Sequence, residues 1–274
     1  MKKHLRTVSM ILLAAVFVVG IFLTVRQMIQ YRTAEQSYDH AQQIAFGSTP
    51  QAPTDPVSTS SPDVSVPEAE ATEPEAIIPQ PVQILQSVNI AALQLVNSDV
   101  LGWIYIPDTV ISYPLMRTDD RDEYLHLAWD RTPNDNGSIF LEKSNSRDLS
   151  DFNTIIYGHL MANGTMFGSL KKYAEQDYRD SHPYIYIATA DGVRMYHIFS
   201  AYEASIESDT YRLYFADEAA KQTALSGYIE NSVVTGGPVP EADDRILTLS
   251  TCTGTGFYST RWVVQAVLEG YWAA

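Results

Sequence analysis

The chain has 274 residues, of which 33 are acidic and 18 basic, so its formal net charge is −15 at pH 7. This charge argues against nucleic acid as a partner, because phosphate backbones are bound by basic surfaces. One cysteine excludes an intramolecular disulfide, and the sequence has no Gly-rich phosphate loop and no His/Cys metal cluster, so we expect no cofactor and no metal.

An apolar segment stands near the N-terminus. Residues 8–25 contain no charged side chain, and their number is close to the roughly 17 to 25 residues that span a bilayer. A cleaved signal peptide is the alternative, but its apolar core has usually only about 7 to 15 residues. Lys2, Lys3 and Arg6 precede the segment. The positive-inside tendency therefore predicts a cytoplasmic N-terminus (1–7), a single-pass anchor in the cell membrane and an extracellular remainder.

Two segments separate this anchor from the globular part. The polar residues 26–46 are predicted to continue the membrane helix as a juxtamembrane stalk. Residues 47–81 hold eight prolines among Ser, Thr, Ala and acidic side chains, and they cannot bury enough apolar surface to fold. We expect a disordered tether there, which either lets the folded domain reach its substrates or is an unselective linker.

Residues 82–274 have the composition of one globular domain. Apolar residues at helical spacing from Leu85 to Leu95 predict an opening amphipathic helix. Apolar pairs between Ala219 and Ile229 predict another helix, inserted before the last two strands. Eight short β-rich runs favour a closed barrel or a sandwich. These runs are 103–106, 111–116, 138–141, 153–157, 184–189, 193–202, 246–252 and 260–269.

The single cysteine ends one of these runs. A free cysteine is usually a small buried hydrophobe. Cys252, however, stands where the run 246–252 gives way to turn residues, and strand ends often carry functional side chains. The next run predicts a hairpin, which makes Cys252 and Arg261 neighbours across the strand pair. A guanidinium there can favour the thiolate or stabilise negative charge that develops on a substrate carbonyl.

A catalytic thiol also needs a partner for proton transfer, and six histidines are available. His159 stands out because it follows the strand-like run 153–157 and precedes a loop. A histidine in such a place more often has a structural or surface role, so this assignment is a hypothesis. The other histidines flank the membrane segment, belong to a strand or lie in polar surroundings: His4, His40, His126, His182 and His197.

Several strings of residues resemble those of class B sortases, and they follow the family's order between about residues 83 and 270. One string would be a weak signal, but the ordered set is specific. The strings are Asn97-Ser-Asp-Val-Leu-Gly-Trp-Ile-Tyr-Ile-Pro107, Ile111-Ser-Tyr-Pro114, Asn136-Gly-Ser-Ile-Phe-Leu141, Ile156-Tyr-Gly-His-Leu-Met161, Met166-Phe-Gly-Ser-Leu170 and Thr248-Leu-Ser-Thr-Cys252 followed by Arg261. The resemblance implies a mainly β fold, an eight-stranded sortase-type β-barrel with an N-terminal helix and an inserted helix before the cysteine strand.

The resemblance also implies an activity. Class B sortases are cysteine transpeptidases of Gram-positive bacteria, which cleave a C-terminal sorting signal of exported proteins through a thioester acyl-enzyme. The acyl group then passes to an amine of a cell-wall precursor or of a pilin. Cys252 matches the family nucleophile, and His159 matches the histidine that protonates the leaving amine and deprotonates the incoming one. Arg261 matches the arginine that positions the substrate and stabilises the oxyanion.

In one respect the chain departs from the family pattern. Some class B members carry an acidic residue shortly after the cysteine, whereas residues 253–259 contain no carboxylate. We therefore expect a Cys, His and Arg site without an acid of the triad type. Asp151 and Asn153, which precede the histidine strand, are weaker candidates for orienting His159.

Three further residues are candidates for substrate binding: Thr251, Ser250 and Tyr157. In a regular strand Thr251 points to the face opposite Cys252. It then either packs in the core or offers a hydroxyl near the substrate.

Two alternative functions stay open. A cysteine endopeptidase would use the same thiol and histidine but let water resolve the acyl-enzyme. A catalytically inactive surface-binding module would hold Cys252 as an inert buried thiol.

Overall fold

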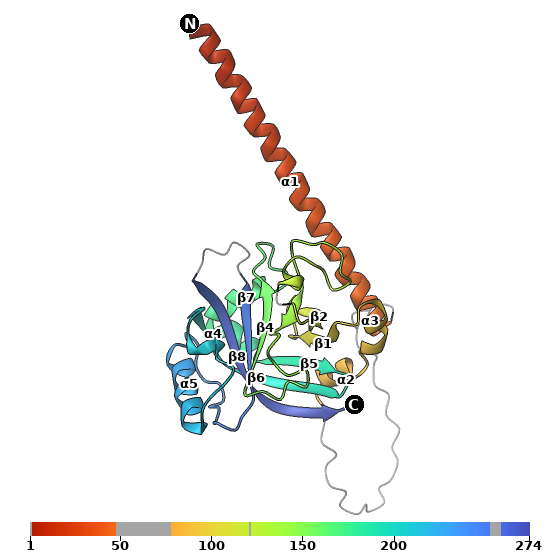
Figure 1. Ribbon diagram of the computed structural model, residues 1–274, viewed down its shortest axis with the longest axis vertical. Helices are drawn as coiled ribbons and strands as arrows, with labels where there is room; N and C mark the ends of the chain where they lie inside the picture. The colour runs from red at the N-terminus through yellow and green to blue at the C-terminus, as the bar shows by residue number, and fades with distance from the viewer. Residues whose placement is uncertain (1, 48–77, 121, 253–258) are drawn as a thin grey trace, which may run out of the picture.

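A computed structural model of the chain describes residues 2–47, 78–120, 122–252 and 259–274, with the backbone alone for residues 2–9, 11 and 252. Within this part, eight strands close into a barrel in the order β1-β2-β3-β4-β7-β8-β6-β5 (Figure 1). The strands are β1 (Val100–Tyr105), β2 (Ser112–Met116), β3 (Ile139–Leu141), β4 (Asn153–His159), β5 (Tyr184–Thr189), β6 (Gly192–Ser205), β7 (Ile246–Cys252) and β8 (Thr260–Ala273).

The helices lie outside the barrel. They are α1 (Lys2–Phe46), α2 (Gln80–Gln86), α3 (Ile90–Val96), α4 (Gln176–Ser181) and α5 (Glu218–Glu230), with short 3-10 helices η1 (Glu123–Leu125), η2 (Gly168–Ala174) and η3 (Asp209–Tyr211). The barrel expected from the sequence is confirmed, and all eight predicted runs form strands that differ from the predictions only at their ends.

The strands β4 and β7 run parallel to each other, whereas most neighbours in the barrel are antiparallel. Every side chain of β4 is buried. Parallel strands are commonly covered on both faces, so their sequences read as nearly continuous apolar runs. Residues 153–157 and 246–249, rich in Ile, Leu and Thr, fit this environment.

The inserted helix is confirmed as α5, which lies between β6 and β7 in the chain. Asp217 caps it by accepting a hydrogen bond from the Ala220 N–H at 2.8 Å. Its buried residues Ala224, Leu225 and Tyr228 pack against side chains of β6, β7 and β8 in a second apolar cluster. This helix therefore covers the outside of the barrel beside the cysteine strand.

The domain opens with two short helices instead of the single helix predicted from Leu85 to Leu95. Helix α2 ends at Gln86, and the side chain of Asn89 caps α3 by accepting a hydrogen bond from the Ala92 N–H at 2.9 Å. Asparagine is a favoured N-cap residue, so it restarts the helix. Leu95, predicted to face the core, is 90% exposed. The predicted apolar stripe is wrong at that position because the restart changes which face of the helix is buried.

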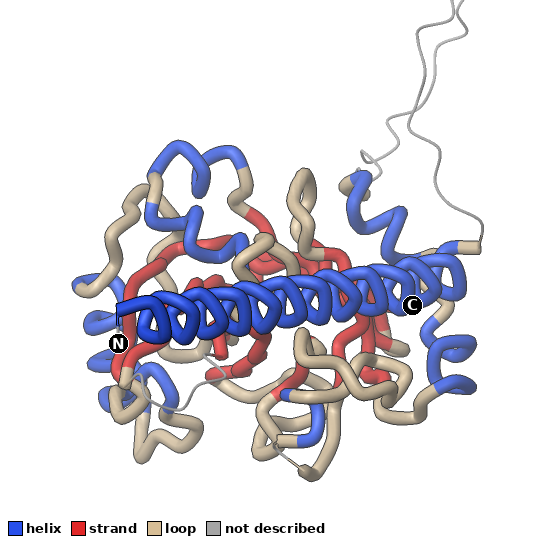
Figure 2. The backbone as a smooth tube through the Cα atoms, turned by 90° about the horizontal axis from the view of Figure 1, so that it is seen from above, coloured by secondary structure: helices blue, strands red, loops and turns tan. Residues whose placement is uncertain are grey.

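Helix α1 is continuous from Lys2 to Phe46. Its N-terminal half projects from the barrel (Figure 1), and in the view from above the helix runs across the barrel (Figure 2). The helix is long and apolar enough to cross a membrane. Its C-terminal half packs on the domain. The buried face there consists of Ala34, Tyr38, Ala41 and Ala45.

Residues near the end of α1 tie the helix to the domain. The Phe46 ring meets Trp103 of β1 edge-on, with the ring centroids 5.4 Å apart. The Asn89 N–H donates to the Ala45 carbonyl at 2.8 Å. Most of the predicted tether 47–81 lies outside the described residues, so that segment stays a prediction. Its two flanking helices, α1 and α2, both pack on the barrel.

An ion pair between a buried arginine and an exposed aspartate closes the β5–β6 turn. Arg194 is 4% exposed, and its guanidinium donates to Asp191 Oδ2 at 2.6 Å and to the Asp148 carbonyl at 3.1 Å. The hydrogen bond from Arg194 lowers the pKa of the Asp191 carboxyl to about 2.

We expect Asp191→Asn to lower Tm at pH 7 by about 2–4 °C, because the buried guanidinium loses an anionic partner worth roughly 1 kcal/mol after allowance for solvent screening. A lowered carboxyl pKa stabilises the fold above the ordinary pKa of about 4 and ceases to do so as the pH falls toward 2. Thermal unfolding of both proteins should therefore show a Tm difference at pH 7 that shrinks near pH 2. An unchanged difference at both pH values would contradict the assignment.

Candidate active site

His159 and Cys252 end two neighbouring strands at the same edge of the barrel. Strands β4 and β7 pair in unbroken parallel register from Asn153 with Ile246 to His159 with Cys252. Adjacent strands lie about 4.8 Å apart. The register therefore places the backbone of the histidine directly beside that of the cysteine.

Arg261 lies on the strand that flanks β7 on its other side. The antiparallel pairing of β7 with β8 is described as far as Ser250 with Val263. Next along, the Trp262 N–H donates to Thr251 Oγ1 at 3.2 Å. Continued by two more pairs, Thr251 with Trp262 and Cys252 with Arg261, this register predicts that Arg261 lies opposite Cys252. Three adjacent strands thus bring a histidine, a cysteine and an arginine to one barrel edge.

A main-chain carbonyl orients the imidazole of His159, which is 6% exposed. Its Nε2 lies 2.8 Å from the carbonyl oxygen of Leu125 in η1. A carbonyl can only accept a hydrogen bond, so Nε2 carries the proton and Nδ1 is the nitrogen that can take up or release a second one. Sequence reasoning missed Leu125, because a backbone carbonyl has no side-chain signature.

Asp151 and Asn153 lie away from the histidine. Asn153 begins β4, six residues before His159 and therefore about 20 Å along the strand. Its amide accepts a hydrogen bond from Thr248 Oγ1 at 2.8 Å. The Asp151 carboxylate accepts from the Ser146 N–H at 2.6 Å. Both side chains fasten the start of the strand and do not reach the imidazole at its end.

The candidate substrate-binding residues sit within the three strands. Tyr157 is paired with Ser250 across β4 and β7, and both side chains are buried. The Ser250 hydroxyl lies 2.9 Å from that of Tyr211, which ties the segment after β6 to β7. Thr251 is 1% exposed, and its hydroxyl bonds to the backbone of Trp262. These contacts place Thr251 where it can hold Arg261 in position from the neighbouring strand.

The guanidinium of Arg261 is half-buried at the start of β8, where Nη1 donates to the Thr260 carbonyl at 2.9 Å. Among the residues that the structure describes, no group of three or more His, Cys, Asp or Glu side chains is placed to hold a metal ion.

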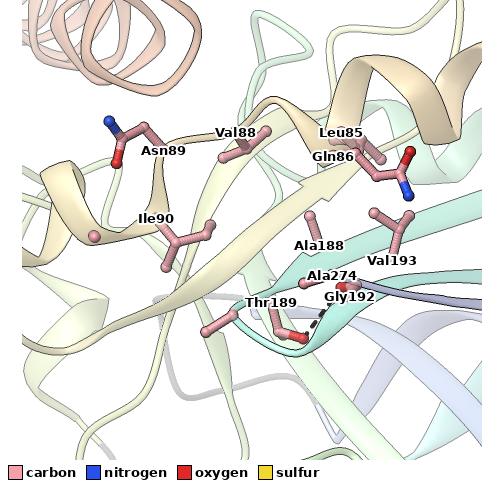
Figure 3. Close-up of a pocket in the computed structure, with 12 residues that line it drawn as sticks. Leu85, Gln86, Val88, Asn89, Ile90, Ala188, Thr189, Gly192, Val193 and Ala274 are labelled. Atoms are coloured by element: carbon pink, nitrogen blue, oxygen red, sulfur yellow. Dashed lines mark hydrogen bonds between the residues drawn. The ribbon is translucent and has the colours of Figure 1, made fainter.

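A pocket of about 530 Å³ lies elsewhere, between the α2–α3 connection and the β5–β6 turn (Figure 3). Its lining has no acidic or basic side chain. In the paired strands β6 and β8, Gly192 at the pocket pairs with Ala273, whereas Ser205 pairs with Thr260 at the other end. The pocket is thus at the opposite end of β8 from Arg261, and it belongs to a different part of the barrel from the candidate site.

A thiol, an imidazole and a guanidinium on adjacent strand ends equip a protein for acyl transfer by a cysteine nucleophile. Residues 104–269 match the protein family described as the sortase domain. Sortase B of Listeria monocytogenes is 37% identical over 183 residues, which cover 64% of this chain and 72% of that protein. Sortase B of Staphylococcus aureus is 31% identical over 173 residues, or 63% and 71% of the two chains.

Solved structures give the same result. The S. aureus sortase B–substrate complex superposes with a TM-score of 0.63 at 30% identity, covering 66% of this chain and 84% of that one. Sortase B from B. anthracis in complex with AAEK1 gives a TM-score of 0.68 at 27% identity, covering 88% and 98%. The chain belongs to the sortase family, and its relatives place it in class B.

Gly158, next to His159, is packed too closely for a side chain. A Cβ there would lie 2.4 Å from Ile139 Cδ1 and 2.8 Å from Phe167 Cδ2. We expect Gly158→Ala to cost about 1–3 kcal/mol through overpacking and to lower Tm by several degrees. Gly227→Ala in α5 is the matched control, because nothing lies within 4 Å of its added Cβ. Thermal unfolding should show that the control is unchanged or stabilised; equal losses in both variants would refute the packing argument.

Proposed function

We propose that this chain is a membrane-anchored transpeptidase that cleaves a C-terminal sorting signal of an exported protein and joins the new end to an amine. The observation that carries the proposal is the register of β4 with β7, which sets His159 beside Cys252, with Arg261 on the next strand. The similarity to a sortase B–substrate complex supports a sorting-signal peptide as the substrate.

In the proposed mechanism, the Cys252 thiolate attacks the scissile carbonyl carbon, and the tetrahedral intermediate breaks down to a thioester as the amine leaves. The Cys252 thiol gives its proton to Nδ1 of His159, because Nε2 keeps its own proton in the bond to the Leu125 carbonyl, and the leaving nitrogen then takes that proton from Nδ1. An incoming amine then loses its proton to the same imidazole and attacks the thioester. Arg261 donates to the substrate carbonyl and stabilises its developing negative charge.

The location follows from helix α1. We propose that residues 8–25 cross the cell membrane once, with the N-terminus in the cytoplasm and the barrel outside, since Lys2, Lys3 and Arg6 precede the apolar run. The acceptor amine is that of a cell-wall precursor or of a pilin. Tyr157, Ser250 and Thr251 are proposed to shape the site beneath the substrate, because they are buried in the strands that carry the reactive residues.

The test of the function is a product analysis of the full chain in detergent, using a fluorescent sorting-signal peptide with and without triglycine as the amine. A joined product that requires the amine supports transpeptidation. Equal cleavage in the absence of the amine would identify a cysteine endopeptidase. Cys252→Ala should form no acyl-enzyme by mass spectrometry while keeping Tm within about 2 °C of the wild type, since the change removes only one sulfur atom at the end of a strand. Turnover of Cys252→Ala at the wild-type rate would refute the mechanism. If the wild-type protein neither turns over the peptide nor reacts with a thiol reagent, the chain is a binding module.

We expect Arg261→Lys to lower kcat/KM by roughly 10²-fold, because lysine keeps the charge but loses the planar fork that can hold a carbonyl oxygen. Arg245→Lys is the control, since Arg245 is exposed and precedes β7 at the end opposite Cys252. Steady-state kinetics with peptide and triglycine distinguish the two variants. Near-normal turnover of Arg261→Lys would show that the geometry of the guanidinium is unimportant.

A further inference from the structure

The loop 117–138 between β2 and β3 lies against both His159 and helix α1. It includes η1, in which the Leu125 carbonyl accepts the hydrogen bond from His159 Nε2. Near the other end of the loop, Gly137 has a φ of 58°, a value that favours glycine. A Cβ on Gly137 would come within 2.7 Å of His159 Cδ2 and 2.9 Å of the Leu125 oxygen. Gly137 therefore packs directly against the imidazole of His159 and against the Leu125 carbonyl that orients it.

Tyr38 of helix α1 holds this part of the loop. Its side chain is buried, and its hydroxyl donates to the Gly137 carbonyl at 2.6 Å. Its ring meets the Tyr113 ring edge-on at a centroid distance of 5.2 Å. The Tyr113 hydroxyl in turn accepts from the Met166 N–H at 3.2 Å, in the loop that follows His159. Tyr38 is thus linked to the loop that packs against His159 and, through Tyr113, to the loop that follows His159 in the chain.

Other α1 residues bind the same loop independently of Tyr38. The Trp129 indole N–H donates to the Ser37 carbonyl at 2.9 Å, and the Ser37 hydroxyl donates to Asp130 at 3.0 Å. Gln30 donates to Asp135. Because the docking of α1 is spread over these contacts, removing the Tyr38 hydroxyl should leave the helix in place and test only the contacts of that hydroxyl with the Gly137 carbonyl and with Ser138 Oγ, which lies 3.3 Å away.

On the basis of the proposed role of His159 in proton transfer, we propose that Tyr38 is a positioning residue for the reaction. Its hydroxyl fixes the Gly137 carbonyl, Gly137 holds the loop against the imidazole, and the Leu125 carbonyl keeps the proton on Nε2. The catalytic unit then includes the juxtamembrane helix as well as the barrel. The position of the imidazole must be precise, because a misplacement of a catalytic group by about 1 Å can lower the rate on the order of 10²-fold.

The test compares Tyr38→Phe with the wild type, using the full chain in detergent, a sorting-signal peptide and triglycine. Phenylalanine keeps the ring packing and removes only the hydroxyl. We expect kcat to fall about tenfold, with the KM for the peptide unchanged within about twofold, because the buried Tyr38 does not contact the peptide. Nitrogen-15 NMR of histidine-labelled protein should show the Nε2–H tautomer of His159 in the wild type and a mixture of tautomers in the variant. Gly137→Ala should give a larger loss of kcat.

The control is Tyr173→Phe, since Tyr173 is 1% exposed and its hydroxyl donates to the His182 carbonyl at 2.9 Å. Both variants lose one buried hydroxyl, so both should lower Tm by about 2–4 °C. Only Tyr38→Phe should change kcat and the tautomer. If His159→Ala is inactive while Tyr38→Phe turns over like the control, the positioning role is wrong and the proposed function stands. Full activity of His159→Ala would instead contradict the proposed function.

Discussion

Residues 153–159 of β4 and 246–252 of β7 lie side by side in parallel, without a shift, and the reactive strand ends meet only in this register. A slip of one residue would turn every side chain to the opposite face. Three fully buried polar side chains make such a slip costly. Thr248 donates to Asn153 at 2.8 Å, and Gln265 of β8 donates to Thr248 at 3.1 Å. These hydrogen bonds cross the same three strands that carry the candidate active site, at four to six residues or about 13 to 20 Å from the reactive residues. They therefore fix the strand register on which the positions of those residues depend.

Much of this arrangement could be predicted from the sequence. The β-rich runs identified all eight strands, since β-branched and aromatic residues between turn residues are a local signal. The proximity of Cys252 to Arg261 stays a prediction from hairpin geometry, because the described pairing of β7 with β8 ends at Ser250 with Val263. The pairing of β4 with β7 is different in kind. It joins strands separated by residues 160–245, so no local pattern contains it, and it was not predicted; the family resemblance implied only that His159 and Cys252 act together.

Two features of the site were missed for different reasons. The Leu125 carbonyl could not be found, because every residue has a carbonyl and its direction depends on the folded loop. The docking of α1 did leave a trace in the sequence. Ala34, Tyr38, Ala41 and Ala45 recur at intervals of four, three and four residues, the spacing of one helical face. Alanines give a weak hydrophobic signal, and the stripe was therefore hidden in a segment that looked polar.

The continuity of α1 also bears on which substrates the enzyme can use. Ala34, the first buried residue among the described side chains of the helix, lies nine residues beyond Val25, which corresponds to about 14 Å of helix. With the apolar half of α1 in the bilayer, as proposed, the continuous helix holds the barrel at a fixed distance from the membrane surface. The length of segment 48–77 does not change this distance. A substrate must then present its cleavage point at that distance. The enzyme would then discriminate between substrates by the number of residues between the cleavage point and the substrate's own membrane segment, as well as by the residues of the sorting signal.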